Sequence, residues 1–165
     1  MQLKRIITHL LTTQGHVTKA FPAHVLNTIE QTISASEVSH TGEIQFAVED
    51  ALDGMALFKG QTSQERAIEL FAQLRVWDTQ HNNGLLIYLL LADRAVEIVA
   101  DRGIHEKVGV QVWNTVCRHM ERDFKELNYE AGVVSGVRAI AQHLAQHFPT
   151  DGPTKNELPN RPVLV

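Results

Sequence analysis

The chain has 165 residues, a length that suits one domain of ordinary size. Apolar residues make up 44% of it, which is enough for a core, and the net charge is −4. There is no basic block, and nucleic-acid binders need clustered Lys and Arg for the phosphates, so we expect no nucleic-acid partner. A single cysteine, Cys117, excludes an internal disulfide and favours a reducing compartment.

The sequence predicts no membrane span. Its longest apolar run, Leu85 to Ala92, is far shorter than the roughly 20 residues that a spanning helix needs. The first residues, MQLKRIITHLLTTQG, have a basic start but neither the long apolar region nor the small-residue cleavage site of a signal peptide. We therefore expect a cytoplasmic protein.

Residues 1–36 predict two helices that pack on the rest of the domain. The first is expected to end at Gly15. Its apolar residues share one helical face: Leu3, Ile6, Ile7, Leu10 and Leu11. The second helix runs from about Pro22 to Ser36, with the proline in its first turn.

Residues 37–148 predict an alternation of strands and helices. Apolar residues alternate with polar ones over 42–49, which is typical of a strand. Thr62 and Glu65 form a capping box that opens a helix with its apolar positions at Ala67, Ile68, Phe71, Leu74 and Trp77. The run 85–92 is apolar on both faces and predicts a central strand, and a turn at Asp93-Arg94 leads into a third strand over 95–100.

The remainder of the domain is helical, with two apolar stripes between Trp113 and Phe148. The tail, 149–165, holds four of the five prolines and ends in three apolar residues. A strand, a helix and a second strand imply a right-handed crossover between parallel strands. The sequence thus predicts a three-layer α/β/α sandwich: a small mixed sheet, with strand 85–92 in its middle, flanked by helices on both faces.

The tripeptide Ala-Asp-Arg occurs twice, at 92–94 and 100–102. Eight residues of strand at ~3.3 Å each place Asp93 and Asp101 roughly 25 Å apart, so the two copies cannot form one site. Asp93 is most simply a turn residue, because Asp tolerates turn geometry and bonds its own backbone.

Asp101 is expected to lie at an edge of the sheet where several loops meet. The predicted pairing brings the starts of the first two strands and the end of the third to this edge. The polar residues expected there are Glu37, His40, Glu43, Asp78, Thr79, Asn83, Asp101, Arg102 and His105. Oxygen-rich loops suit a hard cation such as Ca²⁺, with Asp101, Asp78 and Glu43 as the predicted metal ligands. The alternative is a set of caps, turns and surface ion pairs.

Three stretches of the chain resemble the TPM domain family, which includes a thylakoid-lumen protein linked to photosystem II repair. They read SEVSHTGEIQFAVE, RAIELFAQLRVWDTQHNNGLLIYLLLADRAVEIVADRGI and NYEAGVVSGVRAIAQHLAQHFP, within about residues 36–148. The most telling parts are Gly42-Glu43-Ile44, Asn83-Gly84, Asp93-Arg94 and Gly103-Ile104. The resemblance implies an α/β/α sandwich, here of a short cytoplasmic bacterial type.

The resemblance also implies two activities, since some members are described as acid phosphatases and some as calcium binders. Where other members carry Gly-Tyr-Gly-Leu-Glu after the third strand, this chain has Asp101-Arg102-Gly103-Ile104-His105, so the acidic side chain is displaced.

No nucleophile motif is recognisable. Cys117 precedes Arg122 by five residues within a predicted helix, where a phosphate cradle cannot form, and there is no G-x-S-x-G elbow or P-loop. His143 and His147 share a helical face but lack a third metal ligand. Two hypotheses remain: a non-enzymatic binding or accessory module that holds a protein partner, with Ca²⁺ at the sheet edge, or a metal-assisted phosphatase acting on phosphomonoesters.

Overall fold

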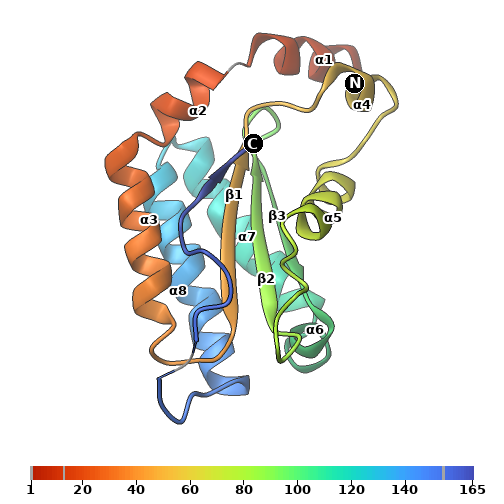
Figure 1. The fold of residues 1–165 in the computed structure, drawn as a ribbon. Coiled ribbons are helices and arrows are strands. Elements are labelled where there is room, and N and C mark those ends of the chain that lie inside the picture. The colour runs from red at the N-terminus through yellow and green to blue at the C-terminus, as the bar shows by residue number, and fades with distance from the viewer. Residues whose placement is uncertain (1, 13, 154) are drawn as a thin grey trace.

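The computed structural model describes residues 2–12, 14–153 and 155–165, without the side chains of residues 2 and 14. A four-stranded mixed sheet lies between two layers of helices (Figure 1), which confirms the predicted sandwich. The strands are β1 (Glu43–Glu49), β2 (Gly84–Leu90), β3 (Ala95–Ala100) and β4 (Val163–Leu164). The helices are α1 (Gln2–Leu11), α2 (Gln14–Ala20), α3 (Ala23–Ser36), α4 (Gly54–Phe58), α5 (Ser63–Gln73), α6 (Arg102–Val108), α7 (Val110–Lys125) and α8 (Tyr129–His147).

The strand order is β3-β2-β1-β4, with β1 and β2 parallel and β3 antiparallel to β2. The most apolar strand, β2, therefore lies inside the sheet, as its composition predicts. The register places Glu43 opposite Gly84 and Leu85 opposite Ala100. The starts of β1 and β2 and the end of β3 thus meet at one edge, called the amino edge below.

The two faces of the sheet are covered differently. Alternate residues of β1 and β2, among them Phe46 and Ile87, pack against α3, α7 and α8 in the larger core. The opposite face carries Tyr88 and contacts α5 and the C-terminal segment at Leu158. Figure 1 shows α1 and α4 beyond the carboxyl ends of β1 and β2, in a region called the carboxyl edge below.

Several predicted details are wrong. Gly15 does not end the first helix, because α1 ends at Leu11 and Gly15 lies within α2. Strand β2 ends at Leu90, since Leu91 and Ala92 already belong to the turn. Helix α5 ends at Gln73, so Trp77 lies outside it and is 48% exposed; Ile68 also faces solvent, at 54%.

The C-terminal segment contributes a strand that the sequence does not predict as such. Val163 pairs with Ala47 in parallel, so β4 becomes the edge of the sheet beside β1. The apolar end of the tail therefore packs on the domain and extends the sheet.

The entry to β2 explains the Asn-Gly pair at 83–84. A Cβ atom at Gly84 would lie 1.9 Å from the carbonyl oxygen of Val76, so only glycine lets the two backbones approach. This contact fixes the loop before β2, which carries Asp78, Thr79 and Asn83.

Candidate functional site

The amino edge gathers most of the residues predicted there, and hydrogen bonds use many of their polar atoms. Thr79 Oγ1 accepts from the Asn83 amide at 3.1 Å, and Asn83 Nδ2 donates to the Thr41 carbonyl at 2.6 Å. Both residues are buried. The pair ties the loop before β2 to the loop before β1, which is a structural use of these side chains.

Two carboxylates at this edge hold the C-terminal segment. Glu43 Oε2 accepts from the Leu158 amide at 3.1 Å, and Glu37 Oε2 accepts from Asn160 Nδ2 at 2.8 Å. Burial raises the pKa of Glu43, and burial raises the pKa of Glu37 to about 7, with the Asn160 hydrogen bond opposing and the Glu43 charge adding to the rise. Both pKa values rise because the charged form of a carboxyl group is less favourable away from water.

His40 and Asp101 complete the buried part of the amino edge. His40 is almost wholly buried, and burial lowers its pKa, so its ring is neutral at pH 7. Asp101 is the N-cap of α6: one carboxylate oxygen accepts from the Arg102 amide at 2.7 Å, and the other is buried without a partner. The neighbours Arg102 and His105 are exposed.

Asp78, the third predicted metal ligand, lies in solvent and pairs with Arg75 at 3.2 Å. Within the described part of the chain, no three His, Cys, Asp or Glu side chains form a group that could hold a metal ion. Asp101, Asp78 and Glu43 are therefore not brought together as a ligand set in this structure.

The carboxyl edge contains an ion-pair network that the sequence does not predict. Arg5 donates from Nε and Nη2 to Asp93 at 2.8–3.2 Å, and His9 Nε2 lies 2.9 Å from the same carboxylate. His9 Nδ1 accepts a hydrogen bond from the Leu52 amide. The ring hydrogen therefore lies on Nε2, which donates a hydrogen bond to Asp93. Although burial acts to raise the pKa of Asp93, the bonds from Arg5 and His9 lower it overall.

Asp93 lies in the β2–β3 turn, as predicted, but it also bonds Arg5 and His9 of α1. Asp93 anchors α1 across 84 to 88 residues of sequence. One sequence signal existed: Arg5 and His9 are four residues apart and share a helical face. The sequence does not indicate which acidic residue Arg5 and His9 bind.

A second buried network lies at the end of β1. Glu49 accepts three hydrogen bonds from Arg66 and one from the Tyr88 hydroxyl at 2.6 Å. Burial and the Glu49 charge raise the pKa of Tyr88 above its ordinary value. The guanidinium of Arg66 thus compensates the negative charge of Glu49.

Helix α1 turns its apolar face to solvent. Leu3, Leu10 and Leu11 are 71%, 66% and 69% exposed, and Ile7 is also exposed. Of the apolar residues expected to pack on the domain, Ile6 does so, against the smaller core. The other four face solvent, because Arg5 and His9 fix the helix through Asp93. Met55 and Phe58 of α4, which contacts α1, are exposed as well. We call Leu3, Ile7, Leu10, Leu11, Met55 and Phe58 the α1–α4 apolar surface.

The family model of the TPM domain matches residues 18–143, which is most of the chain. The chain belongs to the TPM domain family. A similar solved structure is that of BA42 from the psychrophilic bacterium Bizionia argentinensis, with 28% identity, a TM-score of 0.78, and coverage of 88% of this chain and 95% of that one. No match was found among curated proteins.

A second solved structure shares the fold. It is the N-terminal domain of a protein from P. gingivalis, with 24% identity, a TM-score of 0.56, and coverage of 74% of this chain and 76% of that one. The TPM match begins within α2, so α1 lies before the matched residues. Among the described helices, none is both long and apolar enough to cross a membrane.

Proposed function

We propose that this TPM domain is a non-enzymatic binding module that docks a protein partner on the α1–α4 apolar surface. The observation that carries the proposal is the outward apolar face of α1. Soluble proteins rarely expose contiguous apolar patches beyond a few hundred Å², and larger ones mark interaction sites. Here the side chains extend over two neighbouring helices.

The orientation of α1 supports a docking role. A helix that is loosely attached would turn its apolar face to the core, because burying a leucine is favourable by about 2 kcal/mol. The bidentate Arg5–Asp93 pair and the His9 bonds hold the polar face inward instead. The apolar side chains are therefore presented outward by a fixed helix.

The charge of α1 favours a protein over a lipid surface. Helices that lie on membranes are rich in Lys and Arg on the polar face. In α1 the only Lys and Arg residues are Lys4 and Arg5, and the latter is tied to Asp93. An apolar surface on a second protein is the occupant that fits.

The test compares two triple variants in pull-downs followed by reconstitution. Leu3→Ser/Ile7→Ser/Leu10→Ser removes the outward face of α1. Val38→Ser/Ile68→Ser/Val110→Ser removes three exposed apolar side chains elsewhere. We expect a protein that co-purifies with the wild type and the control, is lost with the α1 variant, and rebinds when purified. Equal binding by both variants would contradict the proposal.

The same experiment separates other occupants of the surface. Light scattering of the purified chain detects a dimer, which would identify the partner as a second copy if the α1 variant abolishes it. Binding of phosphatidylglycerol vesicles that the α1 variant loses would replace the protein partner by a membrane surface and overturn the proposal.

The environments of two candidate nucleophiles support a module without catalysis. Burial raises the pKa of Cys117 to about 12, so its thiol is protonated at pH 7. Tyr88 is buried and protonated beside Glu49. Metal-assisted hydrolysis of phosphomonoesters remains the alternative hypothesis. A p-nitrophenyl phosphate assay with Ca²⁺ and with Mg²⁺ tests it: we expect no turnover above buffer, and turnover lost on Asp101→Asn would favour the phosphatase.

The calcium site at the amino edge stays a prediction. Three side-chain oxygens there, one each on Asp101, Glu37 and Asn83, are buried without a hydrogen-bond partner. Amide shifts followed during Ca²⁺ titration test the prediction. Shifts centred on residues 37–43 and 101 would support it, and shifts confined to exposed carboxylates would not.

A further inference from the structure

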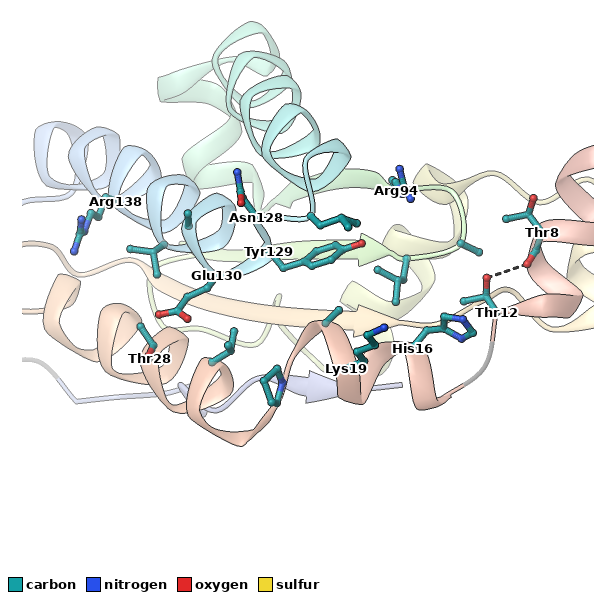
Figure 2. Close-up of a pocket in the computed structure, with 18 residues that line it drawn as sticks. Thr8, Thr12, His16, Lys19, Thr28, Arg94, Asn128, Tyr129, Glu130 and Arg138 are labelled. Atoms are coloured by element: carbon teal, nitrogen blue, oxygen red, sulfur yellow. Dashed lines mark hydrogen bonds between the residues drawn. The ribbon is translucent and has the colours of Figure 1, made fainter.

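A cavity of about 1080 Å³ opens where α1, α2, α3, the β2–β3 turn and the start of α8 meet. Figure 2 shows its lining side chains, which come from segments far apart in the sequence. This volume is slightly above the usual range of about 300–1,000 Å³ for small-molecule sites. The cavity uses none of the residues of the α1–α4 apolar surface.

The charges around the cavity are mostly positive. Lys19, Arg94 and Arg138 line it, and Glu130 is the one acidic residue among its lining residues. The chain as a whole carries −4. None of the three cationic side chains forms an ion pair with a described residue. A positive cavity in an acidic protein concentrates anions.

Between the cationic side chains, the wall is apolar. Val25, Leu91 and Val134 contribute aliphatic surface. The ring of Tyr129 is fixed by Phe21 and Phe124, with ring centroids 5.5 Å and 5.4 Å away. Figure 2 shows this ring between Arg94 on one side and Lys19 on the other. A ligand that fills the cavity would meet both apolar surface and positive charge.

The backbone holds Arg94 in an unfavourable conformation beside the cavity. Its φ is 50°, and Leu127, which also lines the cavity, has a φ of 63°. A residue other than Gly, Asn or Asp costs about 1 kcal/mol or more in this left-handed region. Such local strain is typical of ligand sites.

Two helices begin at the cavity without a side-chain cap. Pro22 precedes α3 and Asn128 precedes α8, and neither side chain accepts a hydrogen bond from the first turn. The positive ends of the two helix dipoles add to the potential of Lys19, Arg94 and Arg138. They supplement the cationic side chains and would not form a site alone.

We propose that this cavity binds a small organic anion: a carboxylate or phosphate on an apolar chain or ring. The anionic group pairs with Arg94 and Lys19 on either side of Tyr129. The apolar part covers the aliphatic wall at Val25 and Leu91. Recognition requires both parts, and binding involves no covalent step.

Three probes that carry a similar alkyl chain, and a fourth without one, test the two parts of the ligand. Octyl phosphate, octanoate and 1-octanol are titrated below their micelle concentrations, with inorganic phosphate alongside, and amide shifts are followed. We expect shifts at Ala20, Ala92 and Tyr129, and binding of at least one octyl anion about tenfold tighter than octanol or inorganic phosphate. The tighter of the two octyl anions identifies the headgroup. If neither octyl anion binds the protein more tightly than octanol, or neither binds more tightly than inorganic phosphate, the proposal is overturned.

Arg94→Asn is the decisive variant, because Asn suits a left-handed turn and the variant keeps the fold. Its matched control is Arg75→Asn, at a second left-handed arginine (φ 56°) that does not line the cavity. We expect Arg94→Asn and Lys19→Gln each to weaken binding of the preferred octyl anion about tenfold, and Arg75→Asn to leave it unchanged. Unchanged binding in Arg94→Asn and Lys19→Gln would overturn the assignment.

Discussion

The two Asp-Arg pairs occupy opposite edges of one sheet and have different roles. Asp93 receives three hydrogen bonds from Arg5 and one from His9, so it attaches a helix from the far end of the sequence. Asp101 caps the helix that follows it directly. The same dipeptide is a long-range anchor in one place and a local cap in the other. Placement in the fold, and not the motif, decides the role.

The largest expected effect is at Glu49, in the more buried network of the carboxyl edge. Glu49→Ala leaves the Arg66 guanidinium and the Tyr88 hydroxyl without their acceptor, so we expect a loss of about 3 kcal/mol in the free energy of unfolding. Urea denaturation measures it. Glu69→Ala, which removes the exposed second partner of Arg66, should cost less than about 0.5 kcal/mol. Equal losses would show that burial does not decide the effect.

The comparison of the two aspartates can be tested directly. Asp93→Asn should cost about 2 kcal/mol, because it weakens charge-assisted bonds to Arg5 and His9. Asp101→Asn should cost less than 1 kcal/mol, since Asn is also a good N-cap. Thermal and urea unfolding of both variants give the order. The reverse order would mean that α1 is not anchored through Asp93.

The pH dependence of stability tests the amino edge. Burial raises the pKa of Glu37 from 4.5 to about 7 in the folded state. The folded chain then keeps a proton that the unfolded chain releases, so the Glu37 contribution falls as pH rises from about 4.5 to 7 and is level above that. Glu37→Gln should reduce this fall, as measured by urea denaturation at pH 5, 6, 7 and 8.

The control for the pH series is Glu106→Gln, an exposed position on α6. It should leave the profile as in the wild type. The raised pKa of Glu43 acts in the same direction, so part of the fall should persist in Glu37→Gln. His40, whose pKa burial lowers, acts in the opposite direction, so the difference between the variant and the wild type is the quantity to compare. Identical profiles for Glu37→Gln and the wild type would contradict the buried placement of Glu37.

The smallest expected effect is a gain of stability at the β2–β3 turn. Arg94 has a φ of 50°, and Asn tolerates this region better, so Arg94→Asn should raise the free energy of unfolding by about 0.5 kcal/mol. Urea denaturation measures the gain, with Arg94→Ala, which remains strained, as the comparison. A loss in Arg94→Asn would show that the guanidinium stabilises the fold.

Local patterns predict the fold well because each is decided by neighbouring residues. The capping box at Thr62 and Glu65 and the apolar run that becomes β2 are examples. The edge formed by Glu43, Thr79, Asn83 and Asp101 follows from strand pairing, which is why its location could be predicted. Its hydrogen bonds to Leu158 could not, since no local pattern relates residues 115 positions apart.

The orientation of α1 could not be predicted for the same reason, because it depends on a contact between residues far apart in the sequence. Its apolar stripe predicts a helix, and burial is the usual fate of such a stripe. Only the partner of Arg5, 88 residues away, shows that the polar side is the inner one. The apolar face of α1 is thus visible in the sequence as a pattern, while its orientation depends on a contact that the pattern does not encode.

Site-specific photo-crosslinking in living cells tests the binding function most directly. A photoreactive phenylalanine analogue replaces Leu10, and in a separate variant it replaces Ile68, which is exposed and apolar on α5. We expect a discrete adduct with one protein from position 10 and none from position 68. No adduct from position 10, or the same adducts from both positions, would contradict a protein-binding role for the outward face of α1.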